Sequence, residues 1–278
     1  MRVVKIGIIG LGMVGEAVTF GLRRVGHIVY GYDTDPKKGE PNFNKVLGTD
    51  LLFICVPTLT VNGKCDVSIV EEVVHKLSIW QYRGLVVIKS TVPPGTTMRL
   101  NEVPRDRYLR LAFCPEFLRE RARFSDFIDN HELCIAGTFK ASDAELIKSA
   151  HGSLPKHFIR MLPTEAELAK YFVNCFNAQR IVFANAFYDV CQQLGADYTV
   201  IKDAVTKRSG IGPDYLICNE QTREFGGSCL PKDTEAFRSF VDGLGLATEV
   251  FDTIVRENKR VERRHILMKE PDVETAVA

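Results

Sequence analysis

The sequence predicts an α/β fold, in which a Rossmann-type doubly wound parallel sheet is followed by a mainly helical domain. Two patterns support this prediction. Over residues 1–160, short apolar runs rich in Val, Ile and Leu alternate with segments of helical periodicity, which is typical of a parallel sheet covered by helices on both faces. From Pro163 to Leu194 the chain has no internal Gly or Pro, and its apolar residues recur at helical spacing, which predicts one long helix.

The expected elements follow in order along the chain. Strands are predicted at Val3–Ile9, Ile28–Tyr32, Leu51–Val56, Leu85–Lys89, Leu109–Phe113 and Leu133–Ala136. Helices are predicted at Val14–Val25, Val67–Leu77, Ala141–Ala150, Pro163–Leu194, Thr199–Thr206, Pro231–Asp242 and Thr248–Arg263. This order divides the chain into a Rossmann domain (1–160), a helical domain (161–265) and a polar tail (266–278) that we expect to be disordered.

Composition argues against several classes of protein. The 278 residues carry a formal net charge of +1, so there is no bulk attraction to nucleic acid or to an anionic membrane. No apolar run is long enough to cross a bilayer. The eight cysteines include no C-x-x-C pair and follow no secretion signal, so free thiols in a reducing cytoplasm are favoured over disulfides or a metal site. We therefore expect a cytoplasmic protein without metal, nucleic-acid or membrane partners.

A glycine pattern follows the first expected strand and opens the first expected helix. The segment Gly10-Leu11-Gly12-Met13-Val14-Gly15 is a G-x-G-x-x-G in the setting of a dinucleotide-binding loop. Gly10 would permit the tight turn, Gly12 would let the backbone approach a pyrophosphate, and Gly15 would let the helix pack closely on the strand. The free N–H groups of the first helical turn, which contains Met13 and Val14, would bind the phosphates.

Asp33 ends the second expected strand, 18 positions after Gly15. A carboxylate at this point can accept hydrogen bonds from both ribose hydroxyls of a dinucleotide and would repel the 2′-phosphate of NADP. NAD is therefore the expected cofactor, and a Rossmann domain that binds FAD is the alternative.

The segment Phe225–Asp233 (FGGSCLPKD) combines a thiol with charged residues. Pro231 is typical of a first helical turn, which places Cys229 at or just before a helix N-terminus. The helix dipole and Lys232 would stabilise a thiolate, and Lys232 and Asp233 lie on the same helix face as the cysteine. We therefore expect Cys229 to be a nucleophile rather than a structural cysteine beside a surface ion pair.

Gly226–Asp233 also resembles the GGxCxPKD signature of the UDP-glucose/GDP-mannose dehydrogenase family. Four further segments resemble motifs of that family in the same order: Val56–Thr58 (VPT), Ser90–Thr96 (STVPPGT), Pro115–Glu120 (PEFLRE) and Glu167–Asn174 (ELAKYFVN). The resemblance extends from residue 3 to about residue 265. It implies NAD as cofactor and oxidation of the C6 alcohol of a nucleotide sugar to a carboxylate, with Cys229 carrying first a hemithioacetal and then a thioester.

The resemblance further implies the roles of individual residues. The catalytic set would be Cys229, Lys170 and Asn174 (oxyanion stabilisation), Asp233 (water), Glu116 (general base) and Thr91. Besides the glycine loop and Asp33, the cofactor would contact Thr58, Thr91, Glu120 and Lys232. The substrate would contact Glu116, Phe117, Leu118, Lys170, Asn174 and Gly226. If the segment that contains Glu116 and Glu120 is helical, these two carboxylates lie one turn apart.

Three departures from the family pattern leave the substrate open. Family members carry a C-terminal nucleotide-binding domain that we expect this chain to lack, and the segment from Asp33 to Leu51 is short. The loop before the signature reads NEQTREFGG, where relatives have N-P-G-F-G-Y-G-G, so Arg223 and Glu224 stand in a loop that contacts the sugar in relatives.

We expect UDP-glucose as the substrate, with GDP-mannose as the alternative, and a homodimer formed through the helix at 163–194, which pairs two subunits in relatives. Two other functions stay open. One is a non-catalytic module for NAD binding and dimerisation. The other is a two-electron β-hydroxyacid dehydrogenase, which needs a catalytic lysine but no nucleophilic cysteine.

Overall fold

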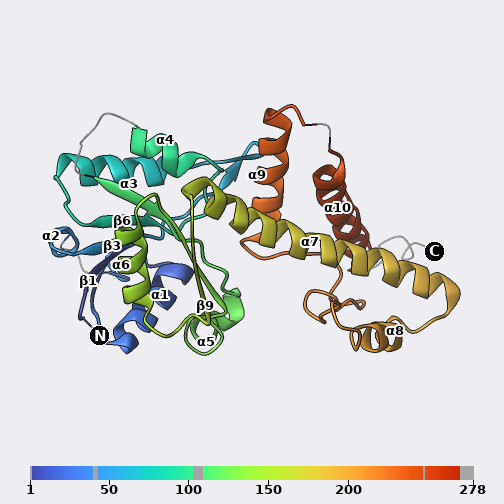
Figure 1. The fold of residues 1–278 in the computed structure, drawn as a ribbon. Coiled ribbons are helices and arrows are strands. Elements are labelled where there is room, and N and C mark those ends of the chain that lie inside the picture. Colours follow the sequence, from blue (N-terminus) through green and yellow to red (C-terminus); the bar gives the residue numbers. More distant parts are fainter. Residues whose placement is uncertain (1, 40–42, 103–108, 247, 270–278) are drawn as a thin grey trace, which may run out of the picture. The chain divides into compact units, whose positions relative to one another are not determined.

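The computed structural model describes residues 2–39, 43–102, 109–246 and 248–269, with side chains to residue 262. The chain forms two compact units (Figure 1). The first comprises residues 1–61 and 65–170, and the second comprises residues 62–64 and 171–278. We call them the Rossmann unit and the helical unit.

The Rossmann unit is built on a seven-stranded sheet in the order β2-β1-β3-β6-β7-β8-β9. Its strands are β1 (Lys5–Ile9), β2 (Ile28–Tyr32), β3 (Leu51–Ile54), β6 (Leu85–Ile88), β7 (Arg110–Phe113), β8 (Leu133–Gly137) and β9 (His157–Met161). The first five in spatial order run parallel to one another. The predicted Rossmann-type fold is thus confirmed.

Helices cover both faces of this sheet (Figure 1). One apolar core joins α1 (Met13–Val25), α5 (Arg123–Ile128) and α6 (Ala141–His151) to one face, which includes Ile6, Ile8 and Phe53. The other core joins α2 (Asn44–Leu47), α3 (Ser68–Ile79), α4 (Thr96–Glu102) and the start of α7 to the opposite face. Because successive residues of a strand point to opposite faces, burial on both sides explains why these strands are apolar throughout.

Two strands run opposite to the other five, which differs from the expected all-parallel sheet. β8 pairs with β7 in antiparallel fashion, and β9 pairs with β8 in parallel fashion. The connection from β7 to β8 contains α5 and a single 3-10 turn (Glu120–Ala122). A helix of α5's length rises only about 9 Å, too little to return the chain to the opposite edge of the sheet. β8 therefore starts at the edge where β7 ends.

The helical unit is organised along α7 (Pro163–Leu194), whose bounds match the predicted helix. It also contains α8 (Tyr198–Val205), α9 (Leu230–Gly243) and α10 (Val250–Lys269). One core joins α7 to α8 through Tyr188 and Tyr198, and another joins α7 to Phe225 and to Ile254 of α10. Gly195 ends α7 with a φ of +66°, the left-handed conformation usual after a helix.

Several smaller elements differ from the expectation. The sequence pattern did not reveal α2, α4, α5, β9 or the hairpin of β4 (Thr60–Val61) and β5 (Lys64–Cys65). In the region expected to be a disordered tail, α10 continues to Lys269, while residues 270–278 lie outside the described residues.

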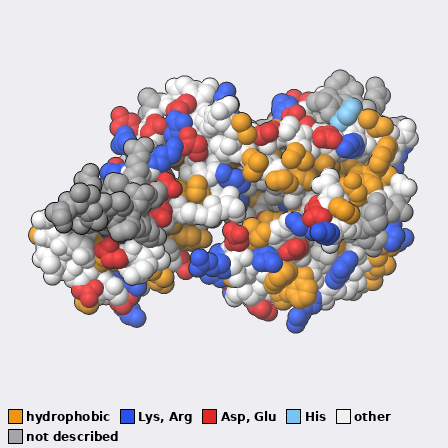
Figure 2. All heavy atoms as spheres, turned by 180° about the vertical axis from the view of Figure 1, so that it is seen from behind, with side chains coloured by type: hydrophobic (Ala, Val, Ile, Leu, Met, Phe, Trp, Pro, Cys, Tyr) orange, Lys and Arg blue, Asp and Glu red, His pale blue; other side chains and the backbone are white. Residues whose placement is uncertain are grey.

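No helix among the residues described is both long and apolar enough to cross a membrane. On the face shown in Figure 2, acidic and basic side chains are interspersed.

Candidate active site

In the Rossmann unit, five of the predicted site residues follow the ends of parallel strands. Gly10 follows β1, Asp33 follows β2, Thr58 and Thr91 come after β3 and β6, and Glu116 comes after β7. The carboxyl ends of parallel strands share one edge of a sheet, and ligands of doubly wound folds bind outside that edge. The fold therefore brings the predicted cofactor residues of this unit to a common edge.

The glycine loop has the shape that a dinucleotide needs. Gly10 has a φ of +89°, and a Cβ at this position would lie 2.6 Å from the carbonyl oxygen of Cys55. A Cβ on Gly15 would lie 1.9 Å from the Gly10 carbonyl oxygen, so only glycine lets α1 pack on this loop. A Cβ on Gly12 would meet nothing within 4 Å, so the backbone there faces open space at the start of α1. Met13 and Val14 form the first turn of that helix. The loop fits a pyrophosphate group.

Asp33 connects this loop to the end of β2. Its Oδ2 accepts a hydrogen bond from the Leu11 amide at 2.6 Å, and its Oδ1 accepts one from the Asp35 amide at 2.9 Å. These bonds fix the carboxylate, and each oxygen keeps a second lone pair for a ribose hydroxyl. A pocket lined by Leu11, Gly31 and Gly39 opens in the same region.

Glu116 is buried, and three contacts hold it. Its Oε1 accepts a hydrogen bond from the Phe117 amide at 3.0 Å, and its Oε2 lies 3.1 Å from Nζ of Lys89. Its backbone carbonyl accepts a hydrogen bond from Nζ of Lys170 at 2.5 Å. Burial acts to raise the pKa of Glu116, but the Lys89 ammonium, helped by His131 and the Phe117 amide, outweighs it and places the pKa below its usual value.

The residues around Glu116 differ in part from the expectation. Lys170 is buried, and its Nζ lies 5.4 Å from the ring centroid of Phe117. Leu118 packs on the core beneath α1 and α5. The segment from Glu116 to Arg119 is not helical, and Glu120 begins a 3-10 turn at the surface. The condition for a one-turn relation between Glu116 and Glu120, a helical segment, is therefore not met.

Glu167 is a buried carboxylate, close in sequence to Lys170, whose contacts were not anticipated. Its carboxylate is fully buried and accepts hydrogen bonds from the amides of Gly95 and Thr97 at 2.6 and 2.8 Å. It also accepts one from the Thr97 hydroxyl at 2.6 Å. These bonds tie the start of α4, just after Thr91, to α7. The signal was present in the sequence, since Glu167 opens the ELAKYFVN motif three residues before Lys170.

In the helical unit, Cys229 caps α9, as the sequence predicted. Its carbonyl accepts the Asp233 amide at 2.9 Å, and Pro231 lies in the first turn. The thiol is half-buried, with Oγ of Ser228 3.6 Å from its sulfur. Lys232 directs its ammonium to Asp233, where the sequence pattern had suggested the thiol.

Asp233 joins the other residues predicted near the thiol. It is 2% exposed, and its Oδ2 accepts a hydrogen bond from Nδ2 of Asn174 at 2.6 Å. Its Oδ1 forms an ion pair with Lys232. The structure thus brings Asn174, Asp233 and Lys232 together at the first turn of the helix that Cys229 caps. A fully engaged carboxylate there fixes the amide and the ammonium beside the helix start.

The loop before Cys229 is held by residues outside the recognised motifs. The side-chain amide of Asn258 on α10 donates to the Phe225 carbonyl at 3.0 Å, and its oxygen accepts the Phe225 amide at 2.8 Å. Arg223, one of the residues that depart from the family pattern, pairs with Asp189 and lies over the Tyr188 ring at 4.7 Å. Gly226 is exposed. No local sequence signal marked Asn258, because its partner lies 33 residues away.

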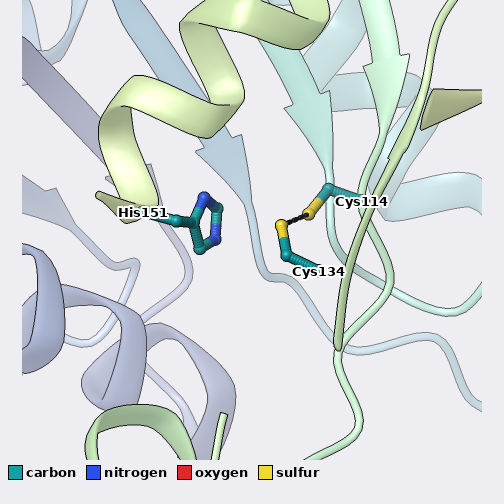
Figure 3. Close-up of side chains that lie close together, drawn as sticks. All are labelled: Cys114, Cys134 and His151. Carbon is teal, nitrogen blue, oxygen red and sulfur yellow. Dashed lines mark hydrogen bonds between the residues drawn. The ribbon is translucent and has the colours of Figure 1, made fainter. Parts of the chain in front are cut away.

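Three buried side chains lie close together: Cys114, which directly follows β7, Cys134 of β8 and His151 of α6 (Figure 3). Their potential ligand atoms lie within 4.8 Å of one another, and the two sulfurs are 3.9 Å apart. Nζ of Lys89 lies 3.4 Å from the Cys114 sulfur, and a buried ammonium at that distance opposes a metal cation. All eight cysteines are free thiols in the structure. We therefore treat these residues as a buried polar cluster and assign no metal to it.

Comparison with known families gives two matches. Residues 40–151 match the NAD binding domain of the UDP-glucose/GDP-mannose dehydrogenase family, and residues 164–260 match its central domain. Together these matches account for most of the chain. The chain belongs to the UDP-glucose/GDP-mannose dehydrogenase family. Its Rossmann unit accordingly corresponds to an NAD-binding domain.

Individual relatives agree with this placement. The chain is 30% identical over 218 residues to UDP-glucose 6-dehydrogenase of Rickettsia bellii, covering 76% of this chain and 49% of that one. It is 26% identical to GDP-mannose 6-dehydrogenase of Pseudomonas savastanoi, covering 91% and 68%. A UDP-glucose dehydrogenase structure from the archaeon Pyrobaculum islandicum superposes with a TM-score of 0.87 at 29% identity, covering 96% and 70%. The chain spans about half the length of the first of these relatives.

Proposed function

We propose that this chain carries out NAD-dependent oxidation of the C6 alcohol of a nucleotide sugar to the uronate, through a thioester on Cys229. The main structural support is the half-buried Cys229 thiol at the start of α9, beside the group formed by Asn174, Asp233 and Lys232. Membership of the family and the intact glycine loop support the cofactor class. UDP-glucose is the proposed substrate, and GDP-mannose is the alternative, because relatives of both names match.

The chemistry explains why a thiol is needed. When bound, NAD⁺ accepts a hydride at each of two oxidation steps. The first oxidation converts the alcohol to an aldehyde, and the Cys229 sulfur adds to the aldehyde carbon to give a hemithioacetal. Oxidation of the hemithioacetal leaves a thioester on Cys229. Water then adds to the thioester carbonyl, the C–S bond breaks, and the carboxylate leaves with the thiol restored.

The remaining residues have proposed roles in these steps. The Lys170 ammonium and the Asn174 amide stabilise negative charge on the oxygen of the reacting carbon. Glu116 takes a proton from the attacking water as its general base, and Asp233 orients the water and holds Asn174 and Lys232. Thr58, Thr91 and Glu120 are proposed to contact the cofactor. Phe117, Leu118 and Gly226 are proposed to contact the sugar.

The decisive experiment counts electrons. The full chain is mixed with a panel of nucleotide sugars, and NADH is measured against the acid formed at completion. We expect two NADH per sugar for one member of the panel, and we expect Cys229→Ser to form no acid. One NADH per substrate with insensitivity to Cys229 alkylation would favour a β-hydroxyacid dehydrogenase. Absence of NADH with every sugar, with NAD still bound, would favour a non-catalytic NAD-binding module.

We also propose that the chain forms a homodimer through α7. Six exposed apolar side chains share one face of this helix in the helical unit: Phe172, Phe176, Phe183, Phe187, Val190 and Leu194. Their spacing of three, four or seven residues forms a continuous stripe, and Phe172 is 71% exposed. An apolar stripe of this length is typical of a surface that a second copy covers.

The dimer can be tested by changing one residue of this stripe. Phe176→Glu places a charge in the stripe, so sedimentation velocity is expected to show loss of the dimer. Gln192→Glu, on an exposed residue of α7 outside the stripe, is the matched control and should leave the dimer intact. A monomeric wild-type chain at micromolar concentration would contradict the proposal.

We propose that the protein resides in the cytoplasm, because eight free thiols suit a reducing compartment. Intact cells are treated with an alkylating reagent before lysis, and alkylation is completed after the protein has been denatured. Mass spectrometry should then find all eight cysteines modified. A disulfide recovered from such cells would contradict this location.

A further inference from the structure

We propose that Lys89 is a positioning residue that holds the Glu116 carboxylate oriented and ionised for hydrolysis of the Cys229 thioester. This inference rests on the proposed function and assigns a task to a lysine that the sequence pattern placed in a plain apolar strand. Lys89 directly follows β6, whose four residues are all buried and apolar, and stands two residues before Thr91.

The position of the ammonium is unusual for a lysine. The Lys89 side chain is 1% exposed, and lysine is almost never fully buried unless it is paired. Its Nζ lies 3.1 Å from Oε2 of Glu116 and 3.4 Å from both the carbonyl oxygen and the sulfur of Cys114. It also lies 5.4 Å from the ring centroid of Phe53. The lysine thus reaches from the end of β6 to the residues that follow β7.

The Lys89 ammonium compensates for the burial of one carboxylate oxygen of Glu116. Oε1 receives the Phe117 amide, whereas Oε2 is buried and accepts no hydrogen bond from the residues that the structure describes. The 3.1 Å ion contact with Lys89 is what offsets the burial of Oε2. Because Oε2 is turned to Lys89, Oε1 is the oxygen left to bind a water and to take its proton.

Other titratable groups around Glu116 do not replace Lys89. Those that face it or act on it within the Rossmann unit are Cys55, Lys89, Cys114, His131, Cys134, His151 and Lys170. Burial lowers the pKa of His151 to about 3, so its ring is neutral at pH 7. Burial also lowers the pKa of His131, and Nδ1 of that ring lies 3.0 Å from the Phe127 carbonyl oxygen, its hydrogen-bond partner. The Lys170 ammonium donates to the backbone carbonyl of Glu116. Lys89 is therefore the cation that the carboxylate group itself contacts.

The ionisation of Glu116 can be measured directly in the full chain. Carbon-13 NMR titration of labelled glutamate, assigned with Glu116→Gln, is run on the wild type and on Lys89→Met. Loss of a buried counter-ion is expected to raise the Glu116 pKa by about 1–3 units. Lys76→Met removes an equal charge from an exposed pair with Glu72 and is the matched control, with no expected shift.

The same variants then report on the reaction. In Lys89→Met, the acid limb of the pH profile for thioester hydrolysis should move upward by the same amount as the Glu116 pKa. The Cys114 thiol has a pKa lowered to about 7 by the Cys134 thiol and Lys89. Removal of Lys89 raises the pKa of this thiol, so the thiol does not contribute an acid limb of its own. A Glu116 pKa that stays in place, or a hydrolysis limb that does not follow it, would overturn the inference.

Two further results separate this inference from its basis. If the wild type forms no acid from any sugar, the proposed function fails and the positioning role of Lys89 in that reaction fails with it, whatever the titration shows. If Lys89→Met does not fold at neutral pH, the double variant Lys89→Met/Glu116→Gln should fold, because it buries no unpaired charge. A double variant no more stable than Lys89→Met would overturn the inference.

Discussion

The two sets of proposed catalytic residues are held in different ways. In the Rossmann unit, Glu116 is a buried carboxylate fixed by a buried ammonium and by backbone bonds. In the helical unit, Cys229 is half-buried on a loop, and its position depends on the start of α9 and on bonds to Phe225. A base needs a set charge, whereas a nucleophile that must reach an aldehyde needs a held backbone and an accessible atom. The difference predicts that the two sets fail in different ways.

The largest expected effect assigns the two sets of residues to different steps: Cys229 forms the thioester, and Glu116 hydrolyses it. Glu116→Gln should slow thioester hydrolysis about 10²–10⁴-fold, the usual contribution of a general base, while NADH formation up to the thioester continues. Rapid-quench sampling should then find the acyl group on Cys229. Cys229→Ser is the paired variant and should accumulate no acyl protein. If Glu116→Gln released acid at the wild-type rate, Glu116 would not be the base.

The second effect concerns the stability of the helical unit. Asp233→Ala should lower the free energy of unfolding by about 3 kcal/mol, because it removes the buried carboxylate that accepts the Asn174 amide and pairs with Lys232. Urea denaturation of the full chain measures it. The matched control is Asp242→Ala. It removes a carboxylate whose side chain is 52% exposed and that pairs with Arg238. That change should stay within about 1 kcal/mol, and equal losses for both variants would contradict the prediction.

A smaller effect tests whether the backbone before Cys229 is held from α10. Asn258→Ala removes both bonds to Phe225 and leaves a buried amide and carbonyl unpaired, with a cost of about 1–3 kcal/mol to the local structure. Hydrogen exchange at the Phe225 amide should become faster, and alkylation of Cys229 should accelerate with it. Arg256→Ala changes an exposed residue of the same helix and should alter neither rate. An unchanged exchange rate in Asn258→Ala would show that other contacts hold the loop.

The same contrast explains what the sequence could predict. The bounds of α7 and the place of Cys229 at the start of α9 follow from local signals, namely the absence of helix breakers and the position of Pro231. β9 escaped prediction because it is an edge strand and only partly buried, so it lacks an apolar run. The contacts of Lys89 and Asn258 join residues more than 24 positions apart, and no local pattern encodes such contacts.

The smallest effect compares two buried carboxylates of the Rossmann unit through the pH dependence of stability. Burial raises the pKa of Glu167, and its bonds to Thr97 and Gly95 offset this only in part. The contribution of Glu167 to stability is therefore present below the pKa of about 4.3 that glutamate has in the unfolded chain. It is lost as the pH rises through the pKa of Glu167 in the folded state. The pKa of Glu116 is lowered, so its contribution is present above about 4.3 and is lost as the pH falls through the folded value.

Urea denaturation between pH 3 and 7 should show these opposite trends. As the pH rises above about 4.3, the wild type should lose stability relative to Glu167→Gln, because the unfolded carboxyl ionises more readily than the buried one. As the pH falls below about 4.3, the wild type should lose stability relative to Glu116→Gln, because the paired carboxylate becomes protonated. The two difference curves therefore slope in opposite directions on opposite sides of the same pH. Slopes of the same sign would mean that Lys89 does not set the charge of Glu116. The contrast between Glu116, which pairs with a lysine, and Glu167, which is held by neutral hydrogen-bond donors, would then be lost.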